Sequence, residues 1–131
     1  MEDLITRISA AAGIEPDVAQ KSIGIILNFL RKEGPSGAVA QVMQGLPGAE
    51  AAADSAASES GGGGLMGGLA SMMGGGGGGL MALAGQLSSA GLGMGEMQAV
   101  GKELFAAAQE KAGPDAIGEI AGAIPGLSQF I

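Results

Sequence analysis

Apolar positions recur at three- and four-residue intervals through residues 1–48, a spacing typical of amphipathic helices. The pattern predicts three consecutive helices, separated at Gly13 and at the Gly-Pro pair 34–35, and ended by the Leu-Pro-Gly segment 46–48. The positions expected to face inward are Leu4, Ile5, Ile8, Ala11 and Ala12 in the first helix, Val18, Ser22, Ile25, Ile26 and Phe29 in the second, and Ala38, Val39, Val42, Met43 and Leu46 in the third.

A second helical stretch repeats this plan. Aligning Val18 with Met97 places the Gly-Pro pair 34–35 on the pair 113–114, and a one-residue slip then places 38–48 on 116–126 with the same Pro-Gly ending. Any two short amphipathic helices joined by Gly-Pro would align, but that alternative leaves the matched second helix unexplained. We interpret the pattern as an internal duplication. The inward positions expected here are Met94, Met97, Gly101, Leu104, Phe105 and Ala108.

The expected architecture is all-α. Two repeats are too few for a stable solenoid, so the two units are expected to pack into one pseudo-symmetric helical domain. The predicted boundaries are an N-terminal unit at 1–48, a linker at 49–79 and a C-terminal unit at 80–131. Residues 49–60 are rich in alanine and serine, which favours either a helix or a solvated linker.

Residues 61–79 are glycine-rich and carry no charge, and three interpretations compete for them. A phosphate-binding P-loop needs Lys-Ser/Thr directly after its second glycine, whereas Leu80 follows here. A membrane span needs about 20 mostly apolar residues, and the glycine content, the missing aromatic belt and the missing flanking cations all disfavour one. A tether with a short apolar island remains. The island residues expected to contact a partner are Met66, Leu69, Met72 and Met73.

Composition excludes several classes of chemistry. The chain has no cysteine and no histidine, which removes disulfides, thiolate metal sites and His-dependent catalytic triads. Its net charge is −7 and no basic stripe occurs, so nucleic acid is not an expected partner. The acidic N-terminal segment differs from a secretory signal, which begins basic and continues apolar. We therefore expect a cytoplasmic location.

The remaining candidates for acid–base catalysis are three glutamates that recur every seven residues. Glu96, Glu103 and Glu110 lie on one helical face, opposite the predicted inward positions. Acids at this spacing are ordinarily a solvated face, and they lack the interleaved oxygen ligands of a calcium loop. We expect no catalytic residue, no metal and no cofactor, and we interpret the chain as a non-enzyme.

The order of these segments resembles the VcgC/VcgE-type family of bacterial proteins of unknown function. The resemblance rests on residues 11–27 (AAGIEPDVAQKSIGIIL), 42–48 (VMQGLPG), the connector 61–79 and residues 88–97 (SSAGLGMGEM). It implies an all-α fold and no assigned activity, and no functional residue can be transferred from it.

Six of the eight methionines lie between Met66 and Met97. Methionine suits adaptable apolar binding surfaces, although here it can equally fill a core that contains only three aromatic residues. The predicted function is protein–protein interaction, with an unidentified partner or a second copy of the chain. The alternative is a peripheral protein of a lipid or granule surface, whose uncharged Met/Leu/Gly segment inserts shallowly.

Overall fold

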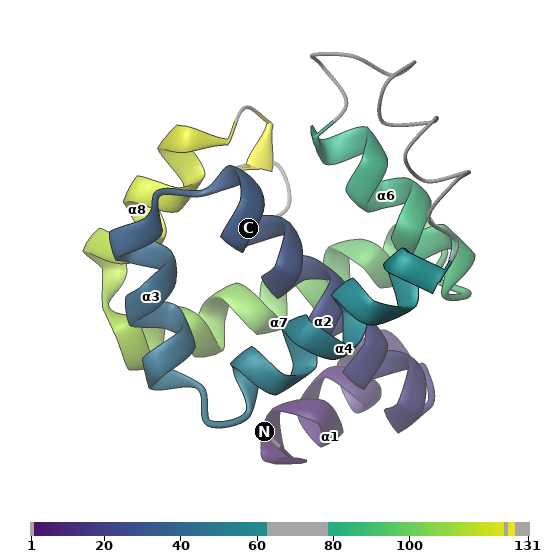
Figure 1. The fold of residues 1–131 in the computed structure, drawn as a ribbon. Helices are drawn as coiled ribbons and strands as arrows, with labels where there is room; N and C mark the ends of the chain where they lie inside the picture. The colour runs from purple at the N-terminus through teal and green to yellow at the C-terminus, as the bar shows by residue number, and fades with distance from the viewer. Residues whose placement is uncertain (1, 63–78, 125, 128–131) are drawn as a thin grey trace.

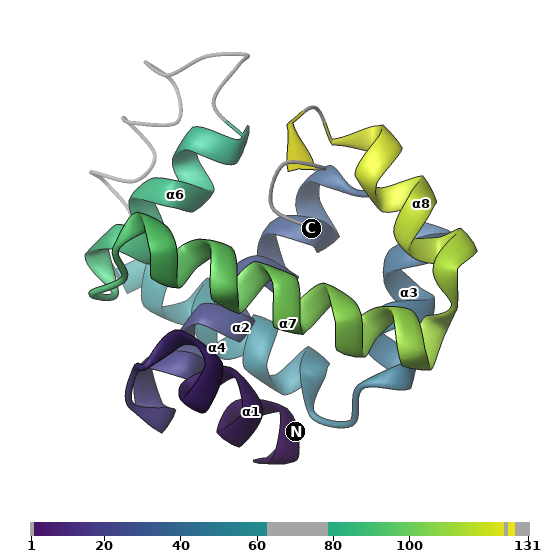
Figure 2. The ribbon, with the colours of Figure 1, turned by 180° about the vertical axis from the view of Figure 1, so that it is seen from behind.

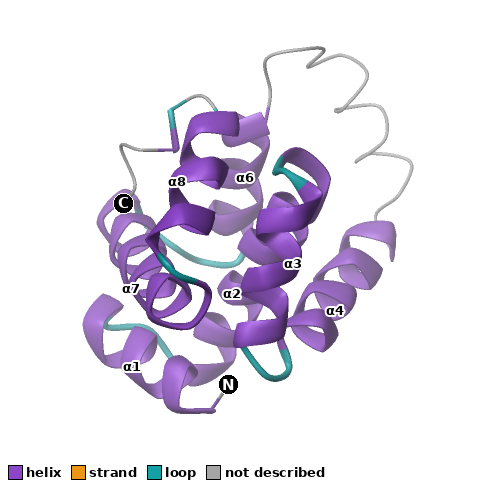
Figure 3. Cartoon of the chain, turned by 90° about the vertical axis from the view of Figure 1, so that its left-hand side faces the viewer, coloured by secondary structure: helices purple, strands orange, loops and turns teal. Residues whose placement is uncertain are grey.

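The computed structural model describes residues 2–62, 79–124 and 126–127. Within these residues it contains seven helices and no strand, which confirms the all-α class (Figures 1 and 3). The helices are α1 (Glu2–Ala12), α2 (Pro16–Glu33), α3 (Ser36–Gly45), α4 (Ala49–Gly62), α6 (Gly79–Ser89), α7 (Met94–Ala112) and α8 (Pro114–Ala123).

Helix α2 lies at the centre of the fold. It begins with Pro16, which needs no hydrogen-bond partner in the first turn, and it ends where the N–H of Gly34 donates to the carbonyl of Leu30 at 2.7 Å. Every residue from 22 to 30 is buried, because α1, α4, α6 and α7 all pack against this helix. It has two buried polar residues, Ser22 and Asn28, and the hydroxyl of Ser22 donates to the carbonyl of Val18 at 2.7 Å.

The first part of the predicted linker is helix α4, and it packs along α2. Ala49, Ala53 and Ala56 of α4 are buried, although the sequence pattern suggested no face that requires burial. Close approach is possible because α2 presents Gly24 at the contact. A Cβ atom on this glycine would lie only 2.4 Å from the carbonyl oxygen of Ala52. The backbones are therefore packed directly on each other, without large side chains between them.

Helices α6, α7 and α8 follow the same plan as α1, α2 and α3. Their lengths are 11, 19 and 10 residues, against 11, 18 and 10 residues in the first set. Matching corners use glycine with positive φ, at Gly13 and Gly91 after the first helices and at Gly48 and Gly126 after the third. The duplication itself, an event in the history of the sequence, stays a prediction.

The two sets of helices are interlocked. Helix α1 packs on α7 of the other set, α6 packs on α2, and α3 lies against α8 (Figures 1 and 2). The buried apolar side chains from all seven helices belong to one continuous cluster. Each set therefore completes part of its core with helices from the other set.

Most of the predicted inward positions are buried, with five exceptions, of which Ile5 and Ala12 of α1 are half-buried and packed against the core. Met94, the first residue of α7, is 78% exposed, so its predicted inward position is wrong. Ala11 is exposed and Val18 is half-buried, since both lie towards the edges of the apolar faces of their helices. The buried stripe of α7 instead begins one turn later, at Met97.

Candidate binding cleft between α2, α6 and α7

The four residues predicted to contact a partner, Met66, Leu69, Met72 and Met73, lie in segment 63–78, outside the described residues. Their role stays a prediction. Within the described residues, the most distinctive site is an apolar cleft where α6, α7 and α2 converge. Its lining consists of Ile26, Leu83, Ala84, Leu87, Met97, Gly101, Phe105 and Leu127.

The cleft arises from the way α6 is held. This helix packs on α2, whereas it makes little contact with α7, the helix that follows it in the chain. Leu83 and Leu87 stand one turn apart on the inner face of α6, and they oppose Met97 and Phe105 on α7. Gly101 lies between these two α7 residues and contributes no side chain, so the wall is recessed at that point.

The cleft is narrow and entirely apolar. Its empty space measures about 350 Å³ when counted out to the open mouth, but only about 20 Å³ lies far enough from the walls for a water-sized sphere. That is room for about one water molecule, and no polar side chain lines the cleft to hold one.

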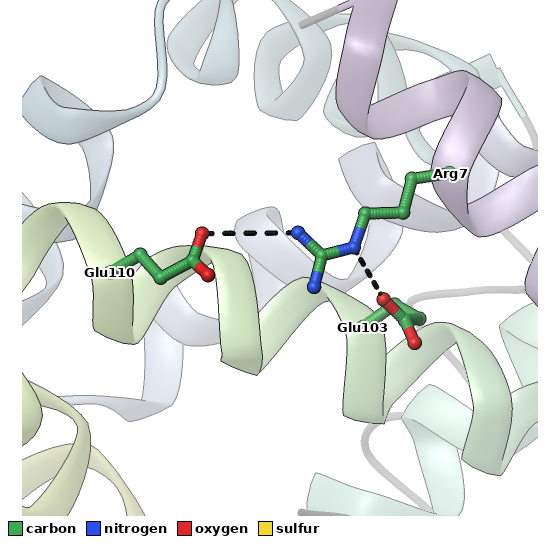
Figure 4. A network of polar contacts seen from close by, with 3 residues as sticks. All are labelled: Arg7, Glu103 and Glu110. Carbon is green, nitrogen blue, oxygen red and sulfur yellow. Dashed lines mark hydrogen bonds and ion pairs between the residues drawn. The ribbon is translucent and has the colours of Figure 1, made fainter.

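The three periodic glutamates make contacts that hold the fold together. Glu96 accepts the N–H of Gly93 through its Oε2 atom at 2.8 Å and so caps the start of α7. Arg7 of α1 donates from Nε to Oε2 of Glu103 at 2.7 Å, and its Nη1 lies 3.8 Å from Oε2 of Glu110 (Figure 4). The guanidinium group thus bridges two turns of α7 and links α1 to it.

Sequence reasoning placed these glutamates on a solvated face and did not find their partner. Arg7 is the only basic residue before Lys21, and the seven-residue spacing of the acids leaves two carboxylates about two turns apart on one face. That combination was the available signal. It becomes decisive only once α1 is known to pack on α7.

A second hollow lies between the beginning of α2 and α4. Its walls combine the polar residues Asp17, Gln20, Lys21 and Ser55 with two alanines of α4. It is wider and more open than the apolar cleft, and it contains one acidic and one basic side chain. Across the described part of the chain, no group of three or more acidic residues is placed to hold a metal ion.

No family model, curated protein or solved structure matches this chain. A search of the described helices for a membrane-crossing segment finds none of sufficient length and hydrophobicity.

Proposed function

We propose that this protein acts without catalysis, through protein–protein contact that includes self-association, and that the apolar cleft receives a side chain of the partner. The observation that carries this proposal is the lining of the cleft. All eight residues around it are apolar, and they come from α2, α6, α7 and the segment after α8.

The chemistry of the walls favours a protein partner over a small polar substrate. Ligand sites for metabolites combine apolar walls with a few polar groups that fix the orientation of the ligand. No polar side chain lines this cleft. An aliphatic or aromatic side chain needs no such group, and its full burial contributes about 1.5–3 kcal/mol. One anchor of this size requires further contacts around the rim for stable binding.

Two features let the cleft adapt to an entering side chain. Met97 is flexible and polarizable, and it lines the wall on the α7 side. Helix α6 is attached mainly to α2. A small movement of α6 away from α7 therefore widens the cleft and leaves the contact between α2 and α4 intact.

The test is to close the cleft without removing core side chains. Ala84 is half-buried at the cleft, and Ala84→Phe fills the space from the α6 side. We expect self-association, measured by sedimentation equilibrium of the full chain, to weaken at least tenfold while the far-UV circular dichroism spectrum is unchanged. Gln86→Phe is the matched control, since Gln86 is exposed on the same helix and does not line the cleft. Equal association of the two variants and the unmodified chain would contradict the proposal.

Shallow binding to a lipid or granule surface is the second candidate. It relies on the uncharged Met/Leu/Gly segment, most of which lies outside the described residues. Flotation with liposomes separates the two functions. A chain that floats equally well with and without Ala84→Phe would favour the lipid surface over the cleft.

The proposed duplication and the cytoplasmic location accompany this function. Duplication is supported by the matched helix lengths and by the paired positive-φ glycines, Gly13 with Gly91 and Gly48 with Gly126. A repeated unit that packs against its own copy offers a simple origin for a self-associating protein, because two surfaces of the same kind are already complementary.

A further inference from the structure

The wall of the apolar cleft includes Leu127, the last residue that the structure describes. Leu127 is 1% exposed and lines the cleft together with residues of α2, α6 and α7. The next four residues, 128–131, have the sequence Ser-Gln-Phe-Ile and lie outside the described residues. Phe130 is three positions from Leu127, a span of at most about 10 Å of extended chain. The chain thus carries an aromatic side chain within reach of its own cleft.

The chain turns into this segment by the same corner that leads from α3 into α4. Gly48 and Gly126 have φ values of +86° and +83°. In both corners the N–H of the next residue, Ala49 or Leu127, donates to the carbonyl three residues earlier, at 3.0 and 3.2 Å. Ala49 and Leu127 are both buried, at 0% and 1% exposure. Both corners therefore direct the chain back onto the core and not out into solvent.

The residues after the first corner show what such a corner leads to. In α4 the positions three and four after the corner residue are Ala52 and Ala53, and both are buried. The same positions after Leu127 are Phe130 and Ile131, with a serine and a glutamine before them. Residues three and four apart share one face of a helical turn. The sequence after the second corner therefore has one apolar side, which Leu127 begins, and one polar side.

We propose that residues 128–131 cover the mouth of the cleft in the same chain, with Phe130 as the contacting side chain. No polar side chain lines the cleft, so its mouth suits an aromatic ring while the serine and the glutamine face solvent. Of the empty space of about 350 Å³, only about 20 Å³ lies away from the walls, so the ring lies across the mouth and not deep inside.

The consequence for binding rests on the proposed function, because it concerns the partner side chain that the cleft receives. That side chain has to displace Phe130 before it enters. The apparent affinity is then reduced by the fraction of chains in which the cleft is open. Residues 128–131 thus regulate the site by competing for it.

Phe130→Trp tests the cover directly, because the full chain has no tryptophan or tyrosine and the new indole is read without background. We expect fluorescence emission blue-shifted from that of a free tryptophan derivative in water, and unchanged on dilution because the contact lies within one chain. Gln129→Trp is the matched control on the polar side of the segment, and it is expected to emit like the free derivative. Equal emission of the two variants would overturn the cover. A blue shift lost on dilution would also overturn it, since Phe130 would then lie in the cleft of a second copy.

Closing the cleft connects the emission to this site. When Ala84→Phe is added to Phe130→Trp, the emission is expected to move to the red, because the new ring on α6 takes the place of the cover. Gln86→Phe, on the exposed side of the same helix, is expected to leave the emission unchanged. Blue-shifted emission that persists with Ala84→Phe would overturn the assignment of Phe130 to the cleft.

Phe130→Ser tests the competition. Self-association of the full chain, measured by sedimentation equilibrium, is expected to strengthen about tenfold, because a partner no longer has to displace a buried aromatic ring. Unchanged or weaker association, in a protein whose association is weakened by Ala84→Phe, would overturn the competition. Failure of the proposed function has a different signature. In that case Ala84→Phe leaves association unchanged while it still shifts the emission of Phe130→Trp.

Discussion

The close contact between α2 and α4 predicts that replacing Gly24 with alanine destabilises the protein. Alanine in place of glycine inside a helix normally stabilises a protein by about 0.5–1 kcal/mol, because glycine loses more conformational freedom on folding. At Gly24 the added Cβ would lie 2.4 Å from the carbonyl oxygen of Ala52 and 3.3 Å from the Cβ of Ala56. The first neighbour is backbone, so the clash cannot be relieved by a side-chain rotation, and α4 has to move away from α2.

The size of the effect follows from these opposing terms. Overpacking a well-packed contact typically costs about 1–3 kcal/mol, and the displaced α4 also loses part of the burial of its alanines. After subtraction of the propensity gain, we expect Gly24→Ala to lower the free energy of unfolding by about 2 kcal/mol. Urea denaturation followed by circular dichroism at 222 nm measures this directly, and it suits a chain without tryptophan or tyrosine.

The matched control is Gly118→Ala. Gly118 is exposed on α8, and a Cβ atom there would have no neighbour within 4 Å. This variant is expected to raise the free energy of unfolding by about 0.5–1 kcal/mol. Equal stability of Gly24→Ala and Gly118→Ala would contradict this prediction, since it would mean that α4 does not pack closely on α2.

Two further variants test other contacts. Gly45→Ala is expected to lower the free energy of unfolding by about 1–3 kcal/mol, because the new Cβ would lie 2.7 Å from the Cβ of Lys111 and would push α3 away from α7. A melting temperature above that of the unmodified chain would contradict this. Arg7→Gln is expected to cost less than about 1 kcal/mol and to reduce the dependence of stability on salt, because its ion pairs with Glu103 and Glu110 are partly exposed. Urea midpoints at low and high salt measure the second effect. A loss of more than about 2 kcal/mol in the free energy of unfolding would contradict the assignment of Arg7 to partly exposed ion pairs.

The parts of the fold that the sequence predicts well are those built from large aliphatic residues. Ile25, Ile26 and Phe29 of α2 are buried, as their spacing predicts, and the helix lies between Gly13 and the Gly-Pro pair 34–35, as expected. Helix α4 was less apparent because alanine buries little area and marks its inner face only weakly. The available signal was Gly24 in α2 together with alanines at a spacing of three and four residues, from Ala49 to Ala56.

The cleft was only partly predictable. Its lining residues Leu83, Leu87, Met97 and Phe105 all fall on helical faces whose periodicity indicates burial. The space between them depends on the distance between α6 and α7, which is a property of tertiary packing and not of either helix alone. The same holds for Arg7, whose two glutamate partners lie about a hundred residues away in the chain.

The interlocked arrangement of α1 with α7 and of α6 with α2 has a consequence for how the chain could be divided. A fragment of residues 1–62 would leave part of α2 uncovered, and a fragment of residues 79–131 would leave part of α7 uncovered. Each fragment therefore needs the other to bury its apolar surface. Separately made, the two pieces are expected to recover their helical structure only on mixing. The covalent link between the two fragments then serves chiefly to keep each at a high effective concentration near the other. A chain that can be divided in this way is a candidate scaffold for a split reporter.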